Sequence, residues 1–360
     1  MISSRLRLLV ALVGLFAVAG CAPSAPASPS PAGTSAAGSG ATTGPASASP
    51  ATGPRSLLID TDVAPDDLVA IALLLASPGV EVEAITVAGT GEARCDAGVD
   101  VILRLLERLD APVIDVACGR ETPIAGDHAF PDAWRASVDD GSGLALPSTA
   151  RQPFAGDAVR LLAETAERVD GLRLLVLGPM TNLADAFGRH PDLVRRLETV
   201  YAMGGALHVP GNVAFGGPPD NEVAEWNIYV DPTAARAVID SGLAVRLVSL
   251  DGTNQVPVTP EFAARFREEA TGQGAQVLAE LFAERPYMAD GTYFLWDPLA
   301  AALAAGYPLG TFSPARVDIE EAEGAEVGFT RPVDGAPNVE YLSVADRAAT
   351  EATLLEVLNR

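Results

Sequence analysis

Short apolar runs alternate with amphipathic segments through most of the chain, and this alternation limits the folds open to it. The first runs lie at Leu57–Ile59, Val82–Val87 and Pro112–Val116. Between them, Leu68–Ala76 and Val99–Leu109 have the apolar spacing of helices. Near-continuous apolar strands are typical of parallel sheets that are buried on both faces. The sequence therefore predicts an α/β fold, with a mainly parallel central sheet and helices on both faces.

The same alternation continues toward the carboxyl end. Further helices are predicted at 157–168, 182–188 and 232–241, and further strands at 172–177, 199–203 and 244–250. Beyond residue 250 the pattern is mostly helical, with short strands near 317–320, 326–330 and 340–344 and a final helix at 346–359. In such sheets, ligands bind beyond the carboxyl ends of the strands.

The first 20 residues have the features of an export signal. Arg5 and Arg7 precede an apolar run, Leu8–Val18, that is too short for a stable membrane span. The segment Val18-Ala19-Gly20-Cys21 resembles a bacterial lipoprotein cleavage box, which implies that Cys21 is lipidated. This predicts an exported lipoprotein anchored at the extracytoplasmic face of the cell membrane. An ordinary secretory signal is the alternative.

A tether is predicted after the signal. Residues 21–55 are rich in Ala, Pro, Ser, Gly and Thr, so they can bury little apolar area and are expected to be disordered. A flexible coil of this length spans on the order of 30 Å. The predicted organisation is a signal at 1–20, a tether at 21–55 and one catalytic or binding domain at 56–360.

The charge balance excludes several classes of function. The formal net charge is −23, and all 24 basic residues are Arg. A nucleic-acid partner is excluded because phosphate binding needs a basic face, and lysine chemistry is excluded because the chain has no Lys. Three His and three Cys do not form a zinc cluster of the usual spacing. An acidic chain is well suited to binding a hard cation through carboxylates.

Export also affects the interpretation of two cysteines. Cys95 follows the second predicted strand and Cys118 ends the third. Outside the cytoplasm such thiols can pair. The sequence leaves a disulfide and two free thiols as alternatives.

Four carboxylates lie within eight residues at the end of the first predicted strand: Asp60, Asp62, Asp66 and Asp67. Like charges this close raise one another's pKa unless something neutralises them. A helix cap explains one or two of them, but not four. A divalent cation explains all four, and all-oxygen ligation favours Ca²⁺ or Mg²⁺.

A haloacid-dehalogenase-like phosphatase is one competing interpretation, because that class also opens with a strand and Asp-x-Asp. It needs a basic residue, usually Lys, to hold the phosphoryl group. The chain has no Lys, and Pro65-Asp66-Asp67 is not the expected continuation.

The motifs taken together resemble the inosine–uridine preferring nucleoside hydrolases. The matching segments, in order, are Asp60-Thr61-Asp62 with Asp66-Asp67, Val82–Gly89, Leu177–Asn182, Met203-Gly204-Gly205 with Gly211-Asn212, Glu225-Trp226-Asn227, and Trp296-Asp297-Pro298. Each motif is weak alone, but six in the right order are specific. The resemblance covers most of residues 56–360, and it implies dimers or tetramers.

The resemblance also implies a role for each matched residue. Asp62 would be the general base and a Ca²⁺ ligand, with Asp67, Asp297 and the Leu177 carbonyl as further ligands. Asp60 would lie behind these residues and hydrogen-bond the loop. The ribose would be held by Asp66, Asn212, Glu225 and Asn227, with Met203 against the sugar and Trp226 near the sugar and base.

This distribution suits cleavage of an N-glycosidic bond. The transition state resembles a ribosyl oxocarbenium cation, which a cluster of anions stabilises. Ca²⁺ lowers the pKa of a coordinated water, and Asp62 can accept its proton. Groups aimed at the ribose hydroxyls discriminate against deoxynucleosides.

Two positions depart from the family pattern. Trp296 stands where many members have a His assigned to the leaving base, and a tryptophan can stack on a base but not protonate it. This resembles the purine-preferring branch, with Trp134 in the loop 127–143 as a second stacking face. Thr90 stands where Asn is common. His128 is the remaining candidate for the acid.

The sequence therefore predicts a lipid-anchored, Ca²⁺-dependent ribonucleoside hydrolase that prefers purine nucleosides. The alternative from another class is an exported nucleoside- or ribose-binding lipoprotein without catalysis. Asp62 beside two further predicted ligands favours the enzyme, because a binding protein needs no general base.

Overall fold

The computed structural model describes residues 55–360. The predicted signal, Cys21 and the predicted tether up to residue 54 lie outside the described residues. Arg55, predicted as the last residue of the tether, is instead the first residue of a strand. Within 55–360, no helix is both long enough and apolar enough to cross a membrane.

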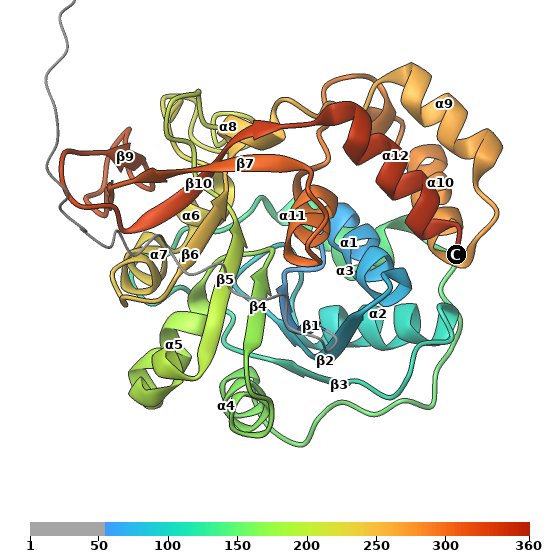
Figure 1. Cartoon of the computed structure of the whole chain (residues 1–360), viewed down its shortest axis with the longest axis horizontal. Coiled ribbons are helices and arrows are strands. Elements are labelled where there is room, and N and C mark those ends of the chain that lie inside the picture. Colours follow the sequence, from blue (N-terminus) through green and yellow to red (C-terminus); the bar gives the residue numbers. More distant parts are fainter. Residues whose placement is uncertain (1–54) are drawn as a thin grey trace, which may run out of the picture. The chain divides into compact units, whose positions relative to one another are not determined.

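The described residues form ten strands and twelve α-helices (Figure 1). Strands and helices alternate through most of the first two thirds of the domain. The strands are β1 (Arg55–Thr61), β2 (Val80–Val87), β3 (Asp115–Cys118), β4 (Leu172–Val176), β5 (Leu197–Met203), β6 (Val245–Val248), β7 (Gly310–Ala315), β8 (Val317–Ile319), β9 (Thr330–Pro332) and β10 (Val339–Ala345). The helices are α1 (Pro65–Ala76), α2 (Cys95–Arg108), α3 (Asp132–Asp139), α4 (Ala158–Arg168), α5 (Thr181–Arg189), α6 (Trp226–Val230), α7 (Pro232–Ile239), α8 (Leu250–Thr253), α9 (Pro260–Glu269), α10 (Gln273–Glu284), α11 (Trp296–Ala304) and α12 (Arg347–Leu358).

The central sheet has eight strands in the order β3-β2-β1-β4-β5-β6-β10-β7. All neighbouring pairs are parallel except β10 and β7, which are antiparallel. The strand order runs outward in one direction from β1 and in the other direction from β4. The carboxyl ends of β1 and β4 therefore flank a topological switch point, where ligands bind in sheets of this kind.

Alternate residues of β1 enter two separate apolar cores, one on each face of the sheet. Leu57 and Ile59 join a core with α1, α2, α10, α11 and α12. Leu58 joins a second core, with α4, α5 and α7. Figure 1 shows these two groups of helices on opposite sides of the strands. The predicted fold class is thus confirmed.

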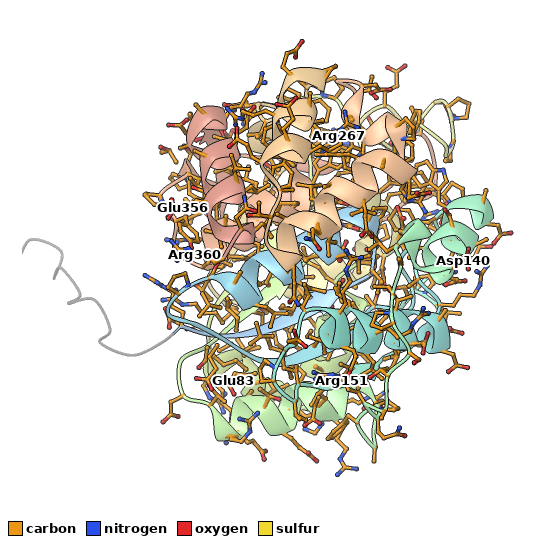
Figure 2. All side chains as sticks on the ribbon, turned by 90° about the vertical axis from the view of Figure 1, so that its right-hand side faces the viewer. Glu83, Asp140, Arg151, Arg267, Glu356 and Arg360 are labelled. Carbon is orange, nitrogen blue, oxygen red and sulfur yellow. A yellow bond between two sulfur atoms is a disulfide. The ribbon has the colours of Figure 1, made fainter. Side chains whose placement is uncertain are left out.

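The acidic surplus lies mainly at the surface. The labelled acidic residues Asp140 and Glu356 are exposed and lie at the periphery of the domain (Figure 2). Most ion pairs in residues 55–360 join Arg to Asp or Glu at exposed or half-buried positions, such as Arg195 with Asp192. Such pairs contribute little to stability.

Four elements differ from the sequence prediction. The strand predicted near 326–330 is displaced, because β9 begins only at Thr330 and the residues before it form a turn. The segment Asp132–Asp139, predicted as part of a loop, forms α3, which buries only Val138. The edge strand β7 was not predicted, because it contains Gly310 and Pro314 and has no buried residue. The strand predicted at 112–116 begins later, at Asp115, and Val113 before it is 94% exposed.

The two thiols left open by the sequence form a disulfide. Cys95 and Cys118 are joined, with their Cα atoms 5.4 Å apart. Cys95 is the first residue of α2 and Cys118 is the last residue of β3. The bond therefore ties the turn after β2 to the carboxyl end of the edge strand.

Candidate active site

The acidic motif lies at the switch point of the sheet. Asp60 of β1 pairs in register with Val176 of β4, so the segments that follow these two parallel strands lie side by side. Gly178, just after β4, lies against the base of Asp62, since a Cβ on Gly178 would be 2.7 Å from the Asp62 Cβ. The parallel strands thus bring the first predicted motif and the Gly-Pro motif to one place.

Three buried aspartates meet at the first turns of two packed helices. Asp66 and Asp67 lie in the first turn of α1, and Asp297 lies in the first turn of α11. One carboxylate oxygen of each lies within 4.8 Å of the others. Asp67 Oδ2 and Asp297 Oδ1 are buried, and neither has a hydrogen-bond partner among residues 55–360. Buried oxygens without donors, gathered in one place, fit a hard divalent cation.

This grouping differs in one respect from the predicted ligand set. Asp67 and Asp297 were predicted as ligands, and the structure brings them together. The third member is Asp66, which was predicted to hold ribose, whereas Asp62 lies beside this group rather than in it. The pKa values of Asp67 and Asp297 are well above the usual value, first because of burial and then because of the neighbouring aspartate charges. A cation would relieve both effects.

Asp62 is held chiefly by backbone groups. Its Oδ2 accepts from the backbone N–H of Glu92 at 3.2 Å, and its Oδ1 has a long contact, 3.5 Å, with the N–H of Ala64. Its carbonyl accepts from the N–H of Ala93 at 2.9 Å. Burial raises the pKa of Asp62 to about 7, and the charges of nearby carboxylates add to this. A carboxylate with this pKa can accept a proton near neutral pH.

The residue after Asp62 has a strained backbone. Val63 has a φ of 68°, which is unusual for a β-branched residue. Its N–H donates to Thr61 Oγ1 at 3.0 Å, and the Thr61 hydroxyl in turn donates to Asp67 Oδ1. This left-handed conformation turns the chain between β1 and α1, so that Asp62 and the two aspartates of α1 lie at the same site.

Asp60 lies behind this loop. Its Oδ1 accepts from Thr86 Oγ1 at 2.6 Å and from Asn182 Nδ2 at 2.7 Å. Burial raises its pKa to about 7, while these two hydrogen bonds lower it. The predicted position of Asp60 behind the site agrees with the structure. Its partners are side chains of β2 and α5, however, and not the loop that was predicted.

Three of the predicted sugar-side residues, Met203, Glu225 and Asn227, lie together at the end of β5. Asn227 Nδ2 donates to the Leu177 carbonyl at 2.9 Å and to the Met203 carbonyl at 3.2 Å. Glu225 Oε1 accepts from the N–H of Asn227, and its Oε2 accepts from the N–H of Gly205, both at 3.0 Å. Burial raises the pKa of Glu225 to about 7. Glu225 therefore also caps α6, which the sequence did not predict.

Asn212 is joined to this group through the backbone of Trp226. Its Oδ1 accepts from the Trp226 N–H at 3.1 Å. The Trp226 ring lies in an aromatic cluster, with its centroid 4.9 Å from that of Phe130 and 5.5 Å from that of Trp134. The Trp134 ring also packs against that of Phe215, and Phe215 is 77% exposed.

Trp296 lies in a different aromatic group. Its ring centroid is 4.6 Å from Tyr293 and 5.6 Å from Phe294. Its Nε1 is buried without a partner among the described residues. The structure thus places the two predicted stacking tryptophans, Trp134 and Trp296, in separate clusters.

His128, the predicted candidate for the acid, has partners at both ring nitrogens in this structure. One ring nitrogen contacts the Tyr229 carbonyl at 3.0 Å and the other contacts Glu323 at 3.2 Å. The imidazole ring also stacks on Tyr229, with centroids 4.4 Å apart. A role as the acid would require the imidazole to exchange one of these contacts for the leaving base, and it stays a prediction.

Sequence reasoning missed three residues at the site. The Tyr293 hydroxyl donates to Asp66 Oδ1 at 2.7 Å, and Glu92 brings a carboxylate near Asp62 and Asp66. The charge of Arg285 partly offsets that of Glu92. Tyr293 lies four residues before Asp297. This short spacing was the only indication in the sequence that Tyr293 lies near the site.

Thr90, the second departure from the pattern, is also held in place. Its hydroxyl lies 3.0 Å from the Thr181 hydroxyl, which donates to Asp231 Oδ2 at 2.8 Å. All three residues are buried. The threonine therefore joins the β2–α2 turn to the start of α5 and to the residue before α7.

Comparison with known proteins gives consistent matches. A sequence model described as inosine-uridine preferring nucleoside hydrolase matches residues 57–352. The pyrimidine-specific ribonucleoside hydrolase RihA of Klebsiella pneumoniae is 36% identical over 216 residues, which is 59% of this chain and 65% of that protein. The chain thus matches slightly less than two thirds of that relative's length.

Solved structures are similar over more of the chain. The inosine-uridine preferring nucleoside hydrolase of Bacillus anthracis has a TM-score of 0.74 at 25% identity, and the purine-preferring ribonucleoside hydrolase of Gardnerella vaginalis has 0.71 at 26%. Each comparison covers 85% of this chain and 99% of the other. The similarity therefore extends over nearly all of residues 55–360.

Proposed function

Because this chain belongs to the inosine-uridine preferring nucleoside hydrolase family, we propose that it hydrolyses the N-glycosidic bond of ribonucleosides to a free base and ribose. One observation carries the proposal. The buried aspartates Asp66, Asp67 and Asp297 gather beside Asp62 and leave two carboxylate oxygens without donors. A solute-binding site has no need for this concentration of buried charge next to a candidate base.

The proposed cofactor is Ca²⁺. Asp66, Asp67 and Asp297 would hold it, with Asp62 and the Leu177 carbonyl at its border. Carboxylate and carbonyl oxygens are the ligands that Ca²⁺ prefers. Such a cation supplies positive charge that acidifies water and orients sugar hydroxyls. Mg²⁺ binds through the same oxygens but demands stricter octahedral geometry, so titration with each ion separates the two.

Asp62 is the proposed general base. Its Oδ1 has only the long contact with the Ala64 N–H, so this oxygen can accept a proton from an attacking water. A pKa raised to about 7 matches that task near neutral pH. The surrounding carboxylates stabilise positive charge as it develops on the ribosyl ring.

Glu225, Asn227 and Asn212 are the proposed ribose-binding residues, with Met203 against the sugar. Their carboxylate and amide groups are already fixed by backbone hydrogen bonds, so little ordering is needed when the sugar binds. Hydroxyls that fill such prearranged sites contribute strongly to discrimination.

The proposed preference is for purine nucleosides, because Trp296 is adjacent to Asp297 and packs against Tyr293, whose hydroxyl binds Asp66, so an aromatic group that could stack on a base lies next to the aspartates. A pyrimidine preference is the second candidate, because the relatives from Klebsiella pneumoniae and Citrobacter koseri are named as pyrimidine-specific. Replacing Trp296 by Ala separates the two. On the purine proposal, turnover of inosine falls about tenfold or more while turnover of uridine changes little.

We further propose that residues 1–20 direct export and that lipidated Cys21 anchors the protein outside the cytoplasm. The apolar run and the cleavage-box residues support this. Metabolic labelling with a radioactive fatty acid tests it, since the label should be lost in Cys21→Ser.

The experiment that tests the activity offers inosine, guanosine, adenosine, cytidine and uridine to the purified chain, and measures ribose release with and without chelator. The proposed hydrolase releases ribose only when the divalent cation is present. Tight binding of a nucleoside with no ribose release would instead support the non-catalytic binding protein.

A further inference from the structure

The turn between β2 and α2, residues 88–94, is built closely around Asp62. Glu92 donates its N–H to Asp62 Oδ2 and Ala93 donates its N–H to the Asp62 carbonyl. Gly91 lies so close that a Cβ there would be 2.2 Å from the Asp62 Cβ. The orientation of Asp62 therefore depends on where this turn lies.

The turn brings an unfavourable charge with it. The Glu92 carboxylate lies near Asp62 and Asp66, and after burial it is the charges of these two residues that raise its pKa. Arg285 is the opposite charge that offsets them. The turn therefore places a further carboxyl group beside these two aspartates.

The carboxyl end of the turn has no ordinary helix cap. Arg94, at the position before α2, makes no side-chain hydrogen bond to the helix. The N–H of Cys95 instead donates to Glu121 Oε1 at 2.7 Å, and the Cys95 sulfur is bonded to Cys118 of β3. The disulfide also underlies the start of the turn, because a Cβ on Gly89 would be 2.8 Å from the Cys95 sulfur.

From this geometry we propose that the Cys95–Cys118 disulfide positions Asp62. The disulfide holds the 88–94 turn against Asp62, the proposed general base. The proposal rests on the proposed function for its catalytic consequence. Neither Cys95 nor Cys118 has a hydrogen bond to Asp62 or to the aspartate cluster, and on this proposal they act through the backbone of Glu92 and Ala93. Breaking the bond leaves the turn held by side-chain contacts of Thr90 and Arg135, by Asp139 on Arg94 and by Glu121 on the Cys95 N–H.

The first test follows the turn itself and does not depend on activity. The full-length chain is compared oxidised and after treatment with dithiothreitol. The dithiol supplies two electrons and two protons, so that Cys95 and Cys118 become thiols and the reagent becomes its cyclic disulfide. We expect amide hydrogen exchange at Glu92 and Ala93 to rise by about tenfold or more, with exchange in β4 and β5 unchanged. Unchanged exchange at Glu92 and Ala93 would overturn the proposal.

The second test measures the catalytic consequence with inosine. Reduction should lower kcat about tenfold and change KM less than about threefold, because a misplaced base affects chemistry more than binding. The Cys95→Ser/Cys118→Ser double variant should show the same loss and no response to dithiothreitol. Cys21→Ser retains the disulfide, so it should respond as wild type does.

A purely stabilising disulfide gives a different result. The double variant would then unfold at a lower temperature but keep the wild-type kcat when assayed well below that temperature, and this would overturn the positioning role. If the oxidised wild type released no ribose, the proposed function would fail, and the exchange measurement would still decide whether the bond holds the turn.

Discussion

Gly91 lies against Asp62 with no room for a side chain between them: a Cβ on Gly91 would be 2.2 Å from the Asp62 Cβ. The glycine lets the β2–α2 turn donate the Glu92 N–H to Asp62 Oδ2. The contact joins the predicted general base to a segment whose motif departs from the family pattern at Thr90.

Replacing Gly91 by Ala should therefore displace either Asp62 or the turn. We expect kcat for nucleoside hydrolysis to fall at least about tenfold, since small displacements of a base are costly to the chemical step. Gly188→Ala is the matched control, because Gly188 lies in α5 and a Cβ there meets nothing within 4 Å. Equal kcat values for Gly91→Ala and wild type would contradict the close contact.

Removal of the cation should abolish turnover reversibly. Chelation leaves Asp67 Oδ2 and Asp297 Oδ1 buried without partners, and added Ca²⁺ should restore ribose release. Asp297→Asn should weaken Ca²⁺ binding about a hundredfold by calorimetric titration, because it removes one charged ligand. Asp170→Asn, at an exposed turn, serves as the control. Full activity in chelator would exclude the cation from the reaction.

The metal-free protein should lose stability as the pH rises from about 5 to about 7. Burial raises the pKa values of Asp60, Asp62 and Glu225 to about 7, whereas in the unfolded chain they ionise near pH 4. In this window the native state binds more protons than the unfolded state, so the free energy of unfolding falls by about 1.4 kcal/mol per pH unit for each group.

Urea unfolding in chelator at pH 5, 6 and 7 measures this slope. The Asp60→Asn variant lacks one of the three groups, so its slope should be shallower by about 1.4 kcal/mol per pH unit. A bound cation favours ionised carboxylates, so Ca²⁺ should stabilise the protein most at pH 7 and above. A metal-free stability that rises between pH 5 and 7 would show that these groups are not protonated in the native state.

Substrates that lack a ribose hydroxyl should react poorly. Glu225 and Asn227 are buried and held by backbone hydrogen bonds, so they cannot easily rearrange when a hydroxyl is missing. We expect kcat/KM for 2′-deoxyinosine to be about a thousandfold below that for inosine. Comparable values for the two nucleosides would show that these residues do not contact the sugar as proposed.

Local sequence was enough to predict the central strands and the acidic motif. β1 and β4 are apolar runs buried on both faces, which few other structures accommodate. β7 was not predicted, because an edge strand that contains Gly310 and Pro314 has neither alternating apolar and polar residues nor a continuous apolar run. The helix α3 escaped because its residues are mostly polar and only Val138 is buried.

The parts of the site that were missed depend on tertiary contacts. Tyr293 reaches Asp66 across 227 residues, and no local spacing encodes that hydrogen bond. Asp62 was predicted as the third member of the aspartate group, and the structure has Asp66 there instead. This difference has a similar cause. It depends on the strained backbone at Val63 and on how α1 packs against α11, neither of which is visible in the order of residues.

The most direct test of the account is ribose release by Asp62→Asn. Asn has nearly the same shape as Asp, and Asp62 lies beside the Asp66, Asp67 and Asp297 group rather than in it, so the variant should fold and still bind Ca²⁺. With inosine and saturating Ca²⁺, we predict that kcat falls about a thousandfold or more while thermal stability is maintained. Turnover by Asp62→Asn equal to that of wild type would contradict the assignment of the general base.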